Sequence, residues 1–458
     1  MAKRFQLVRN QDMKRAMDTP VTAIILAAGE GTRMKSALPK TLHKVGGKSL
    51  LGHAIRSAQA VADSLSVVVG AGGDVVAAEA QAIAPDASIH IQTERLGTAH
   101  AVLAAETGLA GAAGDAVVLY ADTPMISAGT LDCMRRTKAN GADVVILGFH
   151  AAAHSSYGRL IVENGVLTRI VEAKEATPEE LDIAFCNSGV VWSDAQTLLS
   201  LLREVGNDNA KGEYYLTDIV EIANERGLTC AAVECDEAET LGVNSRADLA
   251  AAEAAFQDRA RAAAMTGGTT LIAPETVWFS HDTILGQDLV VEPNVVFGPG
   301  VTVHDGATIR AHSHLEGCVV RSGAIVGPYA RLRPGADIGE GARIGNFVEV
   351  KNATFGKGAK ANHLAYIGDA EVGAGSNIGA GVITANYDGV FKYPSRLGEG
   401  AFVGSNTTLI APVEIGAGAY IAGGSVITGK VAEGALALSR AEKQEKPGLG
   451  AILMAQLR

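Results

Sequence analysis

Apolar side chains recur at every sixth position through most of the second half of the chain. Three runs carry the pattern between about residue 291 and about residue 428: Val291, Phe297, Val303, Ile309 and Leu315; Val320, Val326, Leu332, Ile338, Ile344 and Val350; and Leu397, Val403, Leu409, Ile415, Ile421 and Ile427. Because six is an even number, these side chains all lie on one face of an extended chain. A fixed period predicts stacked repeats, each burying its apolar face against its neighbours. We therefore expect a β-solenoid rather than a β-sandwich with accidental spacing.

The six-residue rhythm is interrupted in one region. Its phase shifts by one residue after Val350 and again between Ile367 and Val372. After Thr384 the rhythm stops, and it resumes only at Leu397. Since the regular repeats form a scaffold, we expect the chemistry of this half to lie at these irregular turns.

The first half of the chain has a different pattern. Buried strands are predicted at residues 21–26, 67–69, 116–120 and 144–147, and the segment 51–61 has helical spacing. Strands that alternate with helices predict a mostly parallel sheet covered on both faces. Ligands of such sheets bind at the carboxyl ends of the strands.

The two patterns divide the chain into parts. A further helical stretch, 247–263, connects the halves, and the repeats stop after Gly429. We expect Met17 to be an alternative start, because the first strand begins at Val21. The expected parts are a mobile extension over residues 1–19, an α/β domain over 20–246, a helical linker over 247–267, the solenoid over 268–440 and a tail over 441–458.

Composition and charge exclude several classes of protein. The formal net charge of −11 argues against a nucleic-acid binder that uses a broad basic surface. The five cysteines form no C-x-x-C pair and no zinc spacing, which fits reduced thiols in a cytoplasmic protein. No apolar run approaches the roughly 18 residues of a membrane span.

The first strand runs directly into a segment suited to phosphate. Small residues from Ala27 to Gly31 allow a phosphate to approach backbone N–H groups, and Arg33 and Lys40 add two cations. The segment is not a G-x-G-x-x-G fingerprint, since Met34 takes the third glycine position. It is not a Walker A loop either.

This segment resembles the signature of the sugar-1-phosphate nucleotidylyltransferases. Later segments strengthen the resemblance: Gln92–Ala99 looks like the stretch of that family that contacts base and ribose, and Asp122 ends a strand. The resemblance implies that Asp122 and Asn244 bind Mg²⁺ and that Arg33 and Lys40 stabilise the leaving pyrophosphate. The implied binding residues for UTP and the nucleotide sugar are Leu26, Ala27, Ala28, Gly29, Lys40, Gln92, Gly97, Thr98, Tyr120, Ala121, Asp122, Gly158, Glu172, Asn187 and Asn244.

Two residues depart from that family's pattern. Ala121 stands where the family usually has Gly before the metal-binding Asp, and we expect its methyl group to crowd the pocket slightly. Glu30 stands where Lys is frequent, which weakens the local positive field but leaves Arg33 and Lys40 in place.

A solenoid fold alone does not establish a function, so the side chains must decide. The strings Asn362–Tyr366, Asn377–Gly381 and Ala385–Gly389 resemble the bifunctional family that acetylates glucosamine-1-phosphate and then uridylylates the product. The resemblance runs from about residue 21 to about residue 440, through both domains in order. It implies a Rossmann-like nucleotide-diphospho-sugar transferase domain followed by a left-handed parallel β-helix of hexapeptide repeats.

Residue roles in the second half follow from this resemblance. His363 is the natural general base, because its ordinary pKa is near 6.5, and we expect Glu349 to orient it. His312 and His314 have no such neighbours and are interpreted as surface residues. Glucosamine-1-phosphate is expected to bind Arg333, Lys351, Tyr366 and Asn377. Acetyl-CoA is expected to bind Ala380, Asn386, Tyr387, Ser405, Gly423 and Arg440, although Gly423 stands where the family often has Ala.

The resemblance implies a cytoplasmic, trimeric enzyme that makes UDP-N-acetylglucosamine, a precursor of bacterial peptidoglycan and lipopolysaccharide. Its substrates would be glucosamine-1-phosphate, acetyl-CoA, UTP and N-acetylglucosamine-1-phosphate, with Mg²⁺ as cofactor and neither nucleic acid nor membrane as partner. Two alternatives stay open: a nucleotidylyltransferase whose solenoid only assembles subunits, and a non-catalytic regulatory subunit of the same architecture. The first should lack the set around His363, and the second should lack the set around Lys40 and Asp122.

Overall fold

The structure is a computed structural model that describes residues 17–152, 155–209 and 211–457. Residues 1–16, and with them most of the expected extension over 1–19, lie outside the described part. The chain forms two compact units, Met1–Phe256 and Gln257–Arg458. The boundary between the two units falls inside helix α10 (Arg246–Thr266). The presence of α10 confirms the helix predicted over residues 247–263. Within the described residues, no helix combines the length and apolarity needed to cross a membrane.

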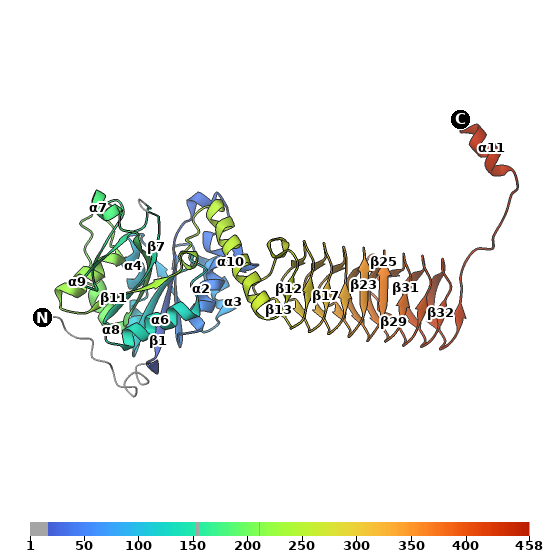
Figure 1. Cartoon of the computed structure of the whole chain (residues 1–458), viewed down its shortest axis with the longest axis horizontal. Helices are drawn as coiled ribbons and strands as arrows, with labels where there is room; N and C mark the ends of the chain where they lie inside the picture. The colour runs from blue at the N-terminus through green and yellow to red at the C-terminus, as the bar shows by residue number, and fades with distance from the viewer. Residues whose placement is uncertain (1–16, 153–154, 210, 458) are drawn as a thin grey trace. The chain divides into compact units, whose positions relative to one another are not determined.

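The first unit is built on one twisted, mostly parallel sheet (Figure 1). Its strand order is β11-β7-β10-β6-β1-β4-β5, and β10 is antiparallel to its neighbours β6 and β7. The strands are β1 (Val21–Ala27), β4 (Ser64–Gly70), β5 (Ser88–Gln92), β6 (Asp115–Tyr120), β7 (Val144–His150), β10 (Phe185–Asp194) and β11 (Cys230–Cys235), with a hairpin of β8 (Arg159–Glu163) and β9 (Val166–Val171) beside β10. The small pair β2 (Lys44–Val45) and β3 (Lys48–Ser49) lies apart from this sheet.

Helices cover both faces of the sheet. Successive side chains of β1 point to opposite faces: Ala23 and Ile25 join one apolar core, and Ile24 and Leu26 join the other. The first core includes α2 (Leu50–Gln59), α3 (Asp74–Ile83) and α6 (Ala128–Ala139), and the second includes α4 (Thr98–Leu103), α5 (Glu106–Ala110), α8 (Ala195–Leu202) and α9 (Ile219–Glu225). Short helices complete the unit: η1 (Thr32–Met34), η2 (Lys40–Leu42), α7 (Pro178–Leu181), η3 (Leu216–Asp218) and η4 (Glu237–Glu239). The α/β prediction is confirmed.

The second unit is a parallel β-helix in which each strand pairs with its counterpart one coil later (Figure 1). One sheet runs through β12 (Thr270–Leu271), β14 (Val290–Val291), β17 (Thr308–Ile309), β20 (Ile325–Val326), β23 (Arg343–Asn346), β25 (Lys360–His363), β27 (Asn377–Ile378), β30 (Phe402–Val403), β32 (Tyr420–Ile421) and β34 (Leu436–Ala437). We call it the first long sheet.

The remaining strands belong to one connected set, which we call the second long sheet. They are β13 (Ile284–Leu285), β15 (Val296–Phe297), β16 (Thr302–Val303), β18 (His314–Leu315), β19 (Val319–Val320), β21 (Arg331–Leu332), β22 (Asp337–Ile338), β24 (Glu349–Phe355), β26 (Tyr366–Val372), β28 (Ile383–Ala385), β29 (Ser395–Leu397), β31 (Thr408–Ile415) and β33 (Val426–Val431). The short helix η5 (Pro274–Thr276) lies near its start, and α11 (Leu449–Gln456) follows its end.

The six-residue markers fill the interior of the β-helix, as predicted. Every marker from Val291 to Ile427 is buried in one continuous core. The coil is longer than its markers suggested. It begins at Thr270, and Leu436–Ala437 pair with β32 after Gly429, where the marked repeats stop. The small Ala437 stands where earlier coils have a bulky marker, so the repeat at this end carries no apolar signal.

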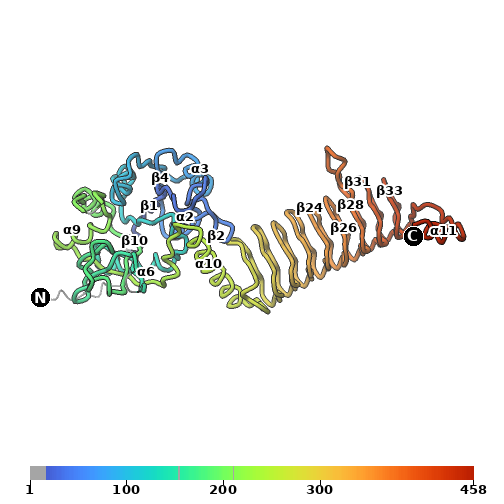
Figure 2. Tube along the Cα trace, turned by 90° about the horizontal axis from the view of Figure 1, so that it is seen from above, coloured from blue at the N-terminus to red at the C-terminus, as the bar shows by residue number. Residues whose placement is uncertain are grey.

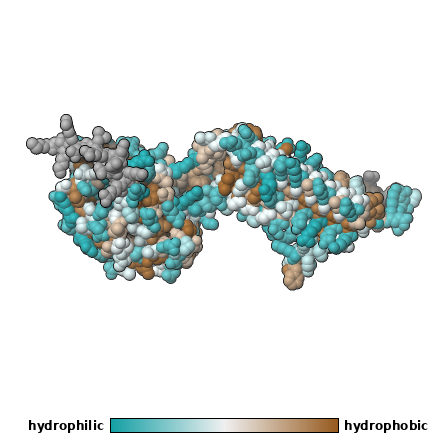
Figure 3. Space-filling view, turned by 90° about the horizontal axis from the view of Figure 1, so that it is seen from below, coloured by the Kyte–Doolittle hydropathy of each residue, from teal (hydrophilic) through white to brown (hydrophobic). Residues whose placement is uncertain are grey.

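The interruptions of the rhythm have visible causes. Asn352 and Asp369 adopt left-handed backbone conformations, with φ of 45° and 47°, inside β24 and β26, and the phase shifts there. Between β28 and β29 the chain leaves the coil as a projecting loop (Figure 2). The apolar tip of this loop contains Val390 and Phe391, which are 73% and 63% exposed (Figure 3).

Candidate functional sites

The glycine-rich segment after β1 forms one wall of a cavity in the first unit. Gly31 has a φ of 64°, and a Cβ atom there would lie 2.4 Å from Cβ of Lys40. Only glycine therefore allows the segment to turn so closely around the lysine. Lys40 begins η2 directly after Pro39, and its side chain is buried.

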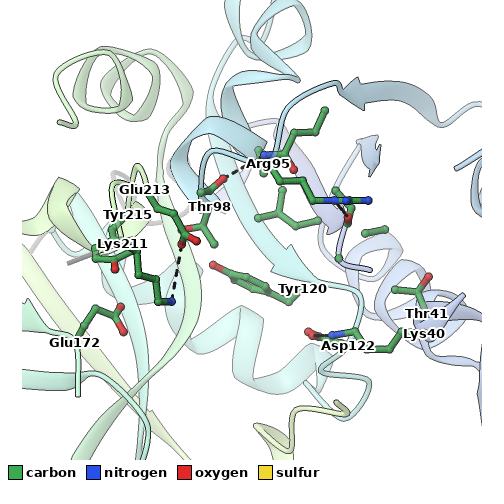
Figure 4. A pocket seen from close by; sticks show the side chains of 17 residues that line it. Lys40, Thr41, Arg95, Thr98, Tyr120, Asp122, Glu172, Lys211, Glu213 and Tyr215 are labelled. Atoms are coloured by element: carbon green, nitrogen blue, oxygen red, sulfur yellow. Dashed lines mark hydrogen bonds and ion pairs between the residues drawn. The ribbon is translucent and has the colours of Figure 1, made fainter. Parts of the chain in front are cut away.

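The cavity has a volume of about 390 Å³ and lies at the carboxyl ends of β1, β5 and β6 (Figure 4). Many of the predicted nucleotide-binding residues line it: Leu26, Ala27, Ala28, Gly29, Lys40, Gln92, Gly97, Thr98, Tyr120, Asp122 and Glu172. The sequence reasoning missed other lining residues, namely Thr41, Arg95, Ala101, Lys211, Glu213 and Tyr215. We call it the nucleotide cavity.

The predicted metal ligands Asp122 and Asn244 point to one place. The ammonium of Lys40 donates to Oδ2 of Asp122 at 2.5 Å and to Oδ1 of Asn244 at 3.0 Å. The backbone holds the two ligands together, because the N–H of Val243 donates to the carbonyl of Asp122 at 2.8 Å. Asp248 in turn accepts from the backbone N–H groups of Asn244 and Ser245.

These two oxygens suit a magnesium ion. A carboxylate and an amide oxygen are hard ligands, and Mg²⁺ commonly takes one or two of them together with substrate phosphates. The part of the chain that the structure describes has no cluster of three or more His, Cys, Asp or Glu side chains that could hold a metal. The Asp122–Asn244 pair therefore fits an ion that arrives with phosphate ligands better than a fully protein-bound metal.

Charged residues beside the glycine-rich segment differ from the expectation. Arg33 is exposed on η1 and is not among the residues that line the nucleotide cavity. Arg95 lines the cavity instead; it donates from Nε to the carbonyl of Ala28 at 3.3 Å and pairs with Glu30. The expected weakening of the positive field by Glu30 is thus balanced locally by Arg95.

The expectation that the methyl group of Ala121 crowds the pocket is wrong. Ala121 is fully buried and packs in the core on one face of the sheet, not against the nucleotide cavity. Its backbone N–H donates to the carbonyl of Leu26 at 3.0 Å.

The three predicted sugar-binding residues Gly158, Glu172 and Asn187 lie together. The N–H of Asn187 donates to the carbonyl of Gly158 at 2.8 Å, and a Cβ atom on Gly158 would lie 3.7 Å from Oε1 of Glu172. Glu172 and Asn187 line a smaller cavity of about 90 Å³, and Glu172 also lines the nucleotide cavity. We call it the sugar pocket.

Burial makes the acids near the sugar pocket reluctant to ionise. It raises the pKa of Glu172, although a hydrogen bond from Thr217 opposes the effect. The pKa of Asp218 rises from 3.8 to about 6, mainly through burial and then through the negative charges of Glu175, Glu172 and Glu221. The sugar side of the site is therefore less negative than its composition suggests near pH 5.

On the β-helix, two of the predicted phosphate-binding cations lie together. Arg333 donates to Glu349 at 2.9 Å. Lys351 lies close enough to Arg333 and Lys392 for both positive charges to lower its pKa. The pKa of Lys351 lies below its ordinary value because Lys392 is an immediate neighbour and Arg333 adds a second positive charge. We call Arg333, Lys351 and Lys392 the cationic group. Such a group favours a dianionic phosphate.

His363 has a different partner from the one expected. Its Nδ1 lies 2.7 Å from Oδ1 of Asn346, which is its partner one coil earlier in the β23–β25 pair. Since an amide oxygen only accepts, Nδ1 carries the proton and Nε2 keeps its lone pair. The prediction that Glu349 orients His363 is wrong, because Glu349 pairs with Arg333 instead.

The other sugar-binding residues lie on two faces of the coil. Tyr366 begins β26 and pairs in register with Glu349, beside the cationic group. Asn377 lies on β27 in the first long sheet, opposite Lys360. The structure therefore brings Tyr366 to the cationic group but places Asn377 on another face. His312 and His314 are exposed, as expected, and His312 stacks on Tyr329.

Most predicted acetyl-CoA residues form a row along successive coils. Ala380 accepts from the N–H of Asn406, next to Ser405, at 2.7 Å. A Cβ atom on Gly423 would lie 3.1 Å from the carbonyl of Ser405, so the backbones are almost in contact. A Cβ atom on the next residue, Gly424, would lie 3.6 Å from Cδ of Arg440. These contacts bring Ala380, Ser405, Gly423 and Arg440 together.

Asn386 and Tyr387 belong to the projecting loop. Asn386 is buried and donates to Asp369, which also accepts from Asn352 at 2.6 Å. Tyr387 is 59% exposed and pairs with Lys392 across the loop. The loop thus carries two predicted cofactor residues, Asn386 and Tyr387, and the third member of the cationic group, Lys392.

The residues that sequence reasoning missed have recognisable signals in hindsight. Asn346 lies 17 residues before His363, which is one coil, so equivalent positions in neighbouring coils should be compared. Lys392 lies in the longest interruption of the rhythm. Arg95 stands inside the stretch Gln92–Ala99, which carries part of the family resemblance. No motif in the sequence indicates that Lys211 or Tyr215 belongs to the site.

Comparison with known proteins supplies the family. The MobA-like NTP transferase domain matches residues 23–181, and bacterial transferase hexapeptide repeats match residues 317–352 and 394–429. Two solved structures of UDP-glucose pyrophosphorylase, with and without UDP-glucose, are 18% identical, cover 52% of this chain and 99% of their own, and give TM-scores of 0.41 and 0.42.

Relatives of nearly the same length are much more similar. The "Bifunctional protein GlmU" of Jannaschia sp. (strain CCS1) is 55% identical over 97% of this chain and 98% of its own. The protein of the same name from Ruegeria sp. (strain TM1040) is 56% identical over 95% and 97%, and that of Bradyrhizobium sp. (strain ORS 278) is 51% identical over 93% and 96%. Identity at this level through both halves leads to one conclusion: the chain belongs to the family of bifunctional GlmU proteins.

Proposed function

We propose that this bifunctional enzyme makes UDP-N-acetylglucosamine in two steps. Residues 268–440 transfer the acetyl group of acetyl-CoA to glucosamine-1-phosphate. Residues 20–246 then transfer the uridylyl group of UTP to N-acetylglucosamine-1-phosphate. One observation carries the proposal: each unit gathers a separate group of reactive side chains, around Asp122 in one and around His363 in the other.

In the first unit, the proposed reaction needs positioning and charge rather than a side-chain nucleophile. A phosphate oxygen of the sugar phosphate attacks the α-phosphorus of UTP, a new P–O bond forms, and pyrophosphate leaves with the electron pair of the broken bond. The glycine-rich segment approaches the phosphates, and Lys40 and Arg95 offset their charge. Asp122 and Asn244 would hold Mg²⁺, which when bound neutralises phosphate charge.

The placement of Arg33 limits its role in this proposal. Because Arg33 is exposed outside the nucleotide cavity, we assign the phosphate contacts of the cavity wall to Lys40 and Arg95. Arg33 remains a candidate for the outer oxygens of the departing pyrophosphate. The sugar would occupy the sugar pocket, against Gly158, Glu172 and Asn187.

In the second unit, proton removal comes first. The sugar amine is protonated near neutral pH, and Nε2 of His363 accepts its proton because Asn346 fixes the other ring nitrogen. The free amine attacks the thioester carbonyl, a C–N bond forms and the C–S bond breaks, and the CoA thiolate leaves and takes up the second proton that the nitrogen loses. The cationic group and Tyr366 would hold the sugar phosphate, and the row from Ala380 to Arg440 would hold the cofactor.

We also propose that the β-helix assembles as a trimer. Asn377 and the cationic group are expected to bind one sugar phosphate, but one chain carries them on different faces of its coil. A neighbouring copy would supply the missing face. Exposed apolar side chains are available for such contacts: Tyr329, Phe347 and Leu364 form a line on one corner, and Val390 and Phe391 form the loop tip.

A cytoplasmic location is part of the proposal. All five cysteines, Cys133, Cys186, Cys230, Cys235 and Cys318, are free thiols. Burial raises the pKa of the Cys230, Cys235 and Cys318 thiols to about 12, so they remain protonated and unreactive at neutral pH.

One assay with two variants tests the proposed function. The purified protein receives glucosamine-1-phosphate, acetyl-CoA, UTP and Mg²⁺. His363→Ala should abolish CoA release yet leave uridylylation of added N-acetylglucosamine-1-phosphate intact, whereas Asp122→Ala should do the reverse. Loss of both activities in either folded variant would show that the two sites are not separate. A wild-type protein that releases no CoA would support an enzyme with a purely structural β-helix.

A further inference from the structure

The ammonium of Lys40 occupies the point on which the proposed metal ligands Asp122 and Asn244 converge. Figure 4 shows Lys40 beside Asp122. It lies within hydrogen-bonding distance of oxygens from both Asp122 and Asn244, at 2.5 and 3.0 Å. The lysine side chain is only 8% exposed, and that of Asp122 is 24% exposed. Water therefore screens this ion pair less than a pair on the surface.

The arrangement is fixed from both sides. Gly31 folds so tightly over Lys40 that any side chain at position 31 would collide with it. The backbone bond between Val243 and Asp122 holds together the two segments that carry the oxygen ligands, independently of the lysine. The two segments therefore stay side by side when the lysine moves away.

A lysine and a metal ion exclude one another at this point. Mg²⁺ binds oxygen ligands at about 2.0–2.1 Å and requires nearly octahedral geometry around itself. An ammonium bonded to both of the same oxygens fills that space, and its positive charge repels the ion. One of the two cations must leave before the other can bind.

We propose that Lys40 is an internal competitor of the divalent metal, so that loading the metal requires the lysine to move away from Asp122 and Asn244. The inference rests on the proposed function in taking these two residues as the metal site. The free protein then binds divalent ions weakly. Phosphate groups entering the nucleotide cavity give the displaced ammonium another partner, since Lys40 and the glycine-rich segment line the same wall.

Binding of Mn²⁺ to the full-length protein without nucleotide tests the competition. Mn²⁺ is the probe, and the electron paramagnetic resonance signal of the free ion gives the dissociation constant. Lys40→Met keeps the aliphatic stem and removes the charge, so it should bind Mn²⁺ at least about tenfold more tightly than the wild type. The matched control is Lys211→Met, which removes one positive charge from the same cavity lining but away from Asp122. It should change the constant by less than about twofold.

The double variant separates the two ways of failing. If Lys40→Met binds Mn²⁺ no more tightly than the wild type, the competition is absent, whatever the function of Asp122. If Lys40→Met tightens binding and Lys40→Met/Asp122→Asn keeps the tight binding, the ion lies elsewhere and the proposed metal site fails. Tightening that is lost in the double variant supports both statements. An equal gain in Mn²⁺ affinity in Lys211→Met would show that the effect comes from net charge alone, and it would overturn the inference.

Discussion

In the α/β unit, the predicted site residues come from distant parts of the chain and meet around a cavity, whereas in the β-helix they stand in rows on an open surface. The first arrangement follows from topology, because parallel strands present their carboxyl ends on one edge of the sheet. The second follows from repetition, because each residue stacks on its counterpart one coil away. A sheet edge can therefore assemble a complete pocket in one chain, but a coil distributes its residues over separate faces.

The difference also affects how each region tolerates change. A solenoid depends on contacts between neighbouring coils, and its stability is close to a sum of local terms. The α/β unit has two extended cores on either side of one sheet. Local damage to the β-helix should thus remove acetyl transfer alone, and five changes, taken from the largest expected effect to the smallest, test this contrast.

Gly345→Ala should break the β-helix beside His363, the proposed general base. A Cβ atom there would lie 1.9 Å from the carbonyl oxygen of Asn362 in the next coil, so the coils must separate. We expect acetyl transfer to fall by about 100-fold or more and uridylyl transfer to change by less than about twofold, as overpacking is costly but local. The measurement is the pair of rates on one preparation.

Gly341→Asn is the matched control for that change. Gly341 has a φ of 65°, but nothing lies within 4 Å of a Cβ atom there, and this chain has Asn in the same conformation at positions 294 and 406. Both activities should be nearly normal. An equal loss of acetyl transfer in the two variants would mean that the loss comes from a change in backbone conformation and not from contact between coils.

Lys392→Ala tests whether the projecting loop supplies a phosphate contact. Removing one of three clustered cations should raise KM for glucosamine-1-phosphate by about tenfold, since a hydrogen bond to a charged group contributes about 1.5–3 kcal/mol. The value of kcat should change little. Lys357→Ala, on an exposed lysine that pairs with Glu340 on the same β-helix, is the control and should leave KM unchanged. An unchanged KM in Lys392→Ala would remove the loop from the phosphate site.

Asn346→Ala tests the partner of the proposed base. Without the amide oxygen the ring can turn, and we expect kcat for acetyl transfer to fall by about 10-fold, within the range for general-base catalysis. Asn346→Asp should restore much of the rate and move the acid limb of the pH profile to higher pH, because a carboxylate favours the imidazolium. Glu349→Gln should alter KM through Arg333 and leave the pH profile in place. A shifted profile in Glu349→Gln alone would reinstate Glu349 as the partner.

Why Glu349 was favoured and Asn346 missed is instructive. Glu349 carries the charge usually found beside a catalytic histidine, whereas the register of the coil, which pairs Asn346 with His363, decides the contact. The sequence pattern predicted the coil, its core and its interruptions, because six-residue spacing depends only on local geometry. The pattern did not predict which face of the β-helix each side chain lies on, since the faces depend on where each coil turns.

In the α/β unit the limits of prediction were of another kind. The end of β1 and the end of β6 could be located from apolar runs, and so could Lys40 and Asp122 near them. The contacts of Lys40 join residues 82 and 204 positions away, and no local pattern encodes such distances. Lys211 and Tyr215 reach the nucleotide cavity from a segment that has no motif of its own.

Asp218→Asn tests the acids beside the sugar pocket through the stability of the fold. The folded-state pKa, about 6, lies above the ordinary 3.8, so the folded state holds its proton more tightly than the unfolded state. Stability is therefore lost as pH rises from about 4 to about 6. The variant should be more stable than the wild type at pH 7.5, by about 1–3 kcal/mol, and lose most of this advantage at pH 4. Urea unfolding at both pH values measures the difference, and a gain independent of pH would contradict a burial cost.

Ala121→Gly should have the smallest effect, although it restores the residue that the resemblance led us to expect. The methyl group lies in the core and not in the nucleotide cavity, so uridylyl transfer should change by less than about twofold. Stability should fall by about 1 kcal/mol, through the loss of a buried methyl group and the added freedom of glycine. A severalfold gain in kcat/KM for UTP would show that the methyl group restricts the substrate after all. The backbone argues against that gain: the N–H of Ala121 already bonds to the carbonyl of Leu26 at 3.0 Å, and glycine would keep this bond.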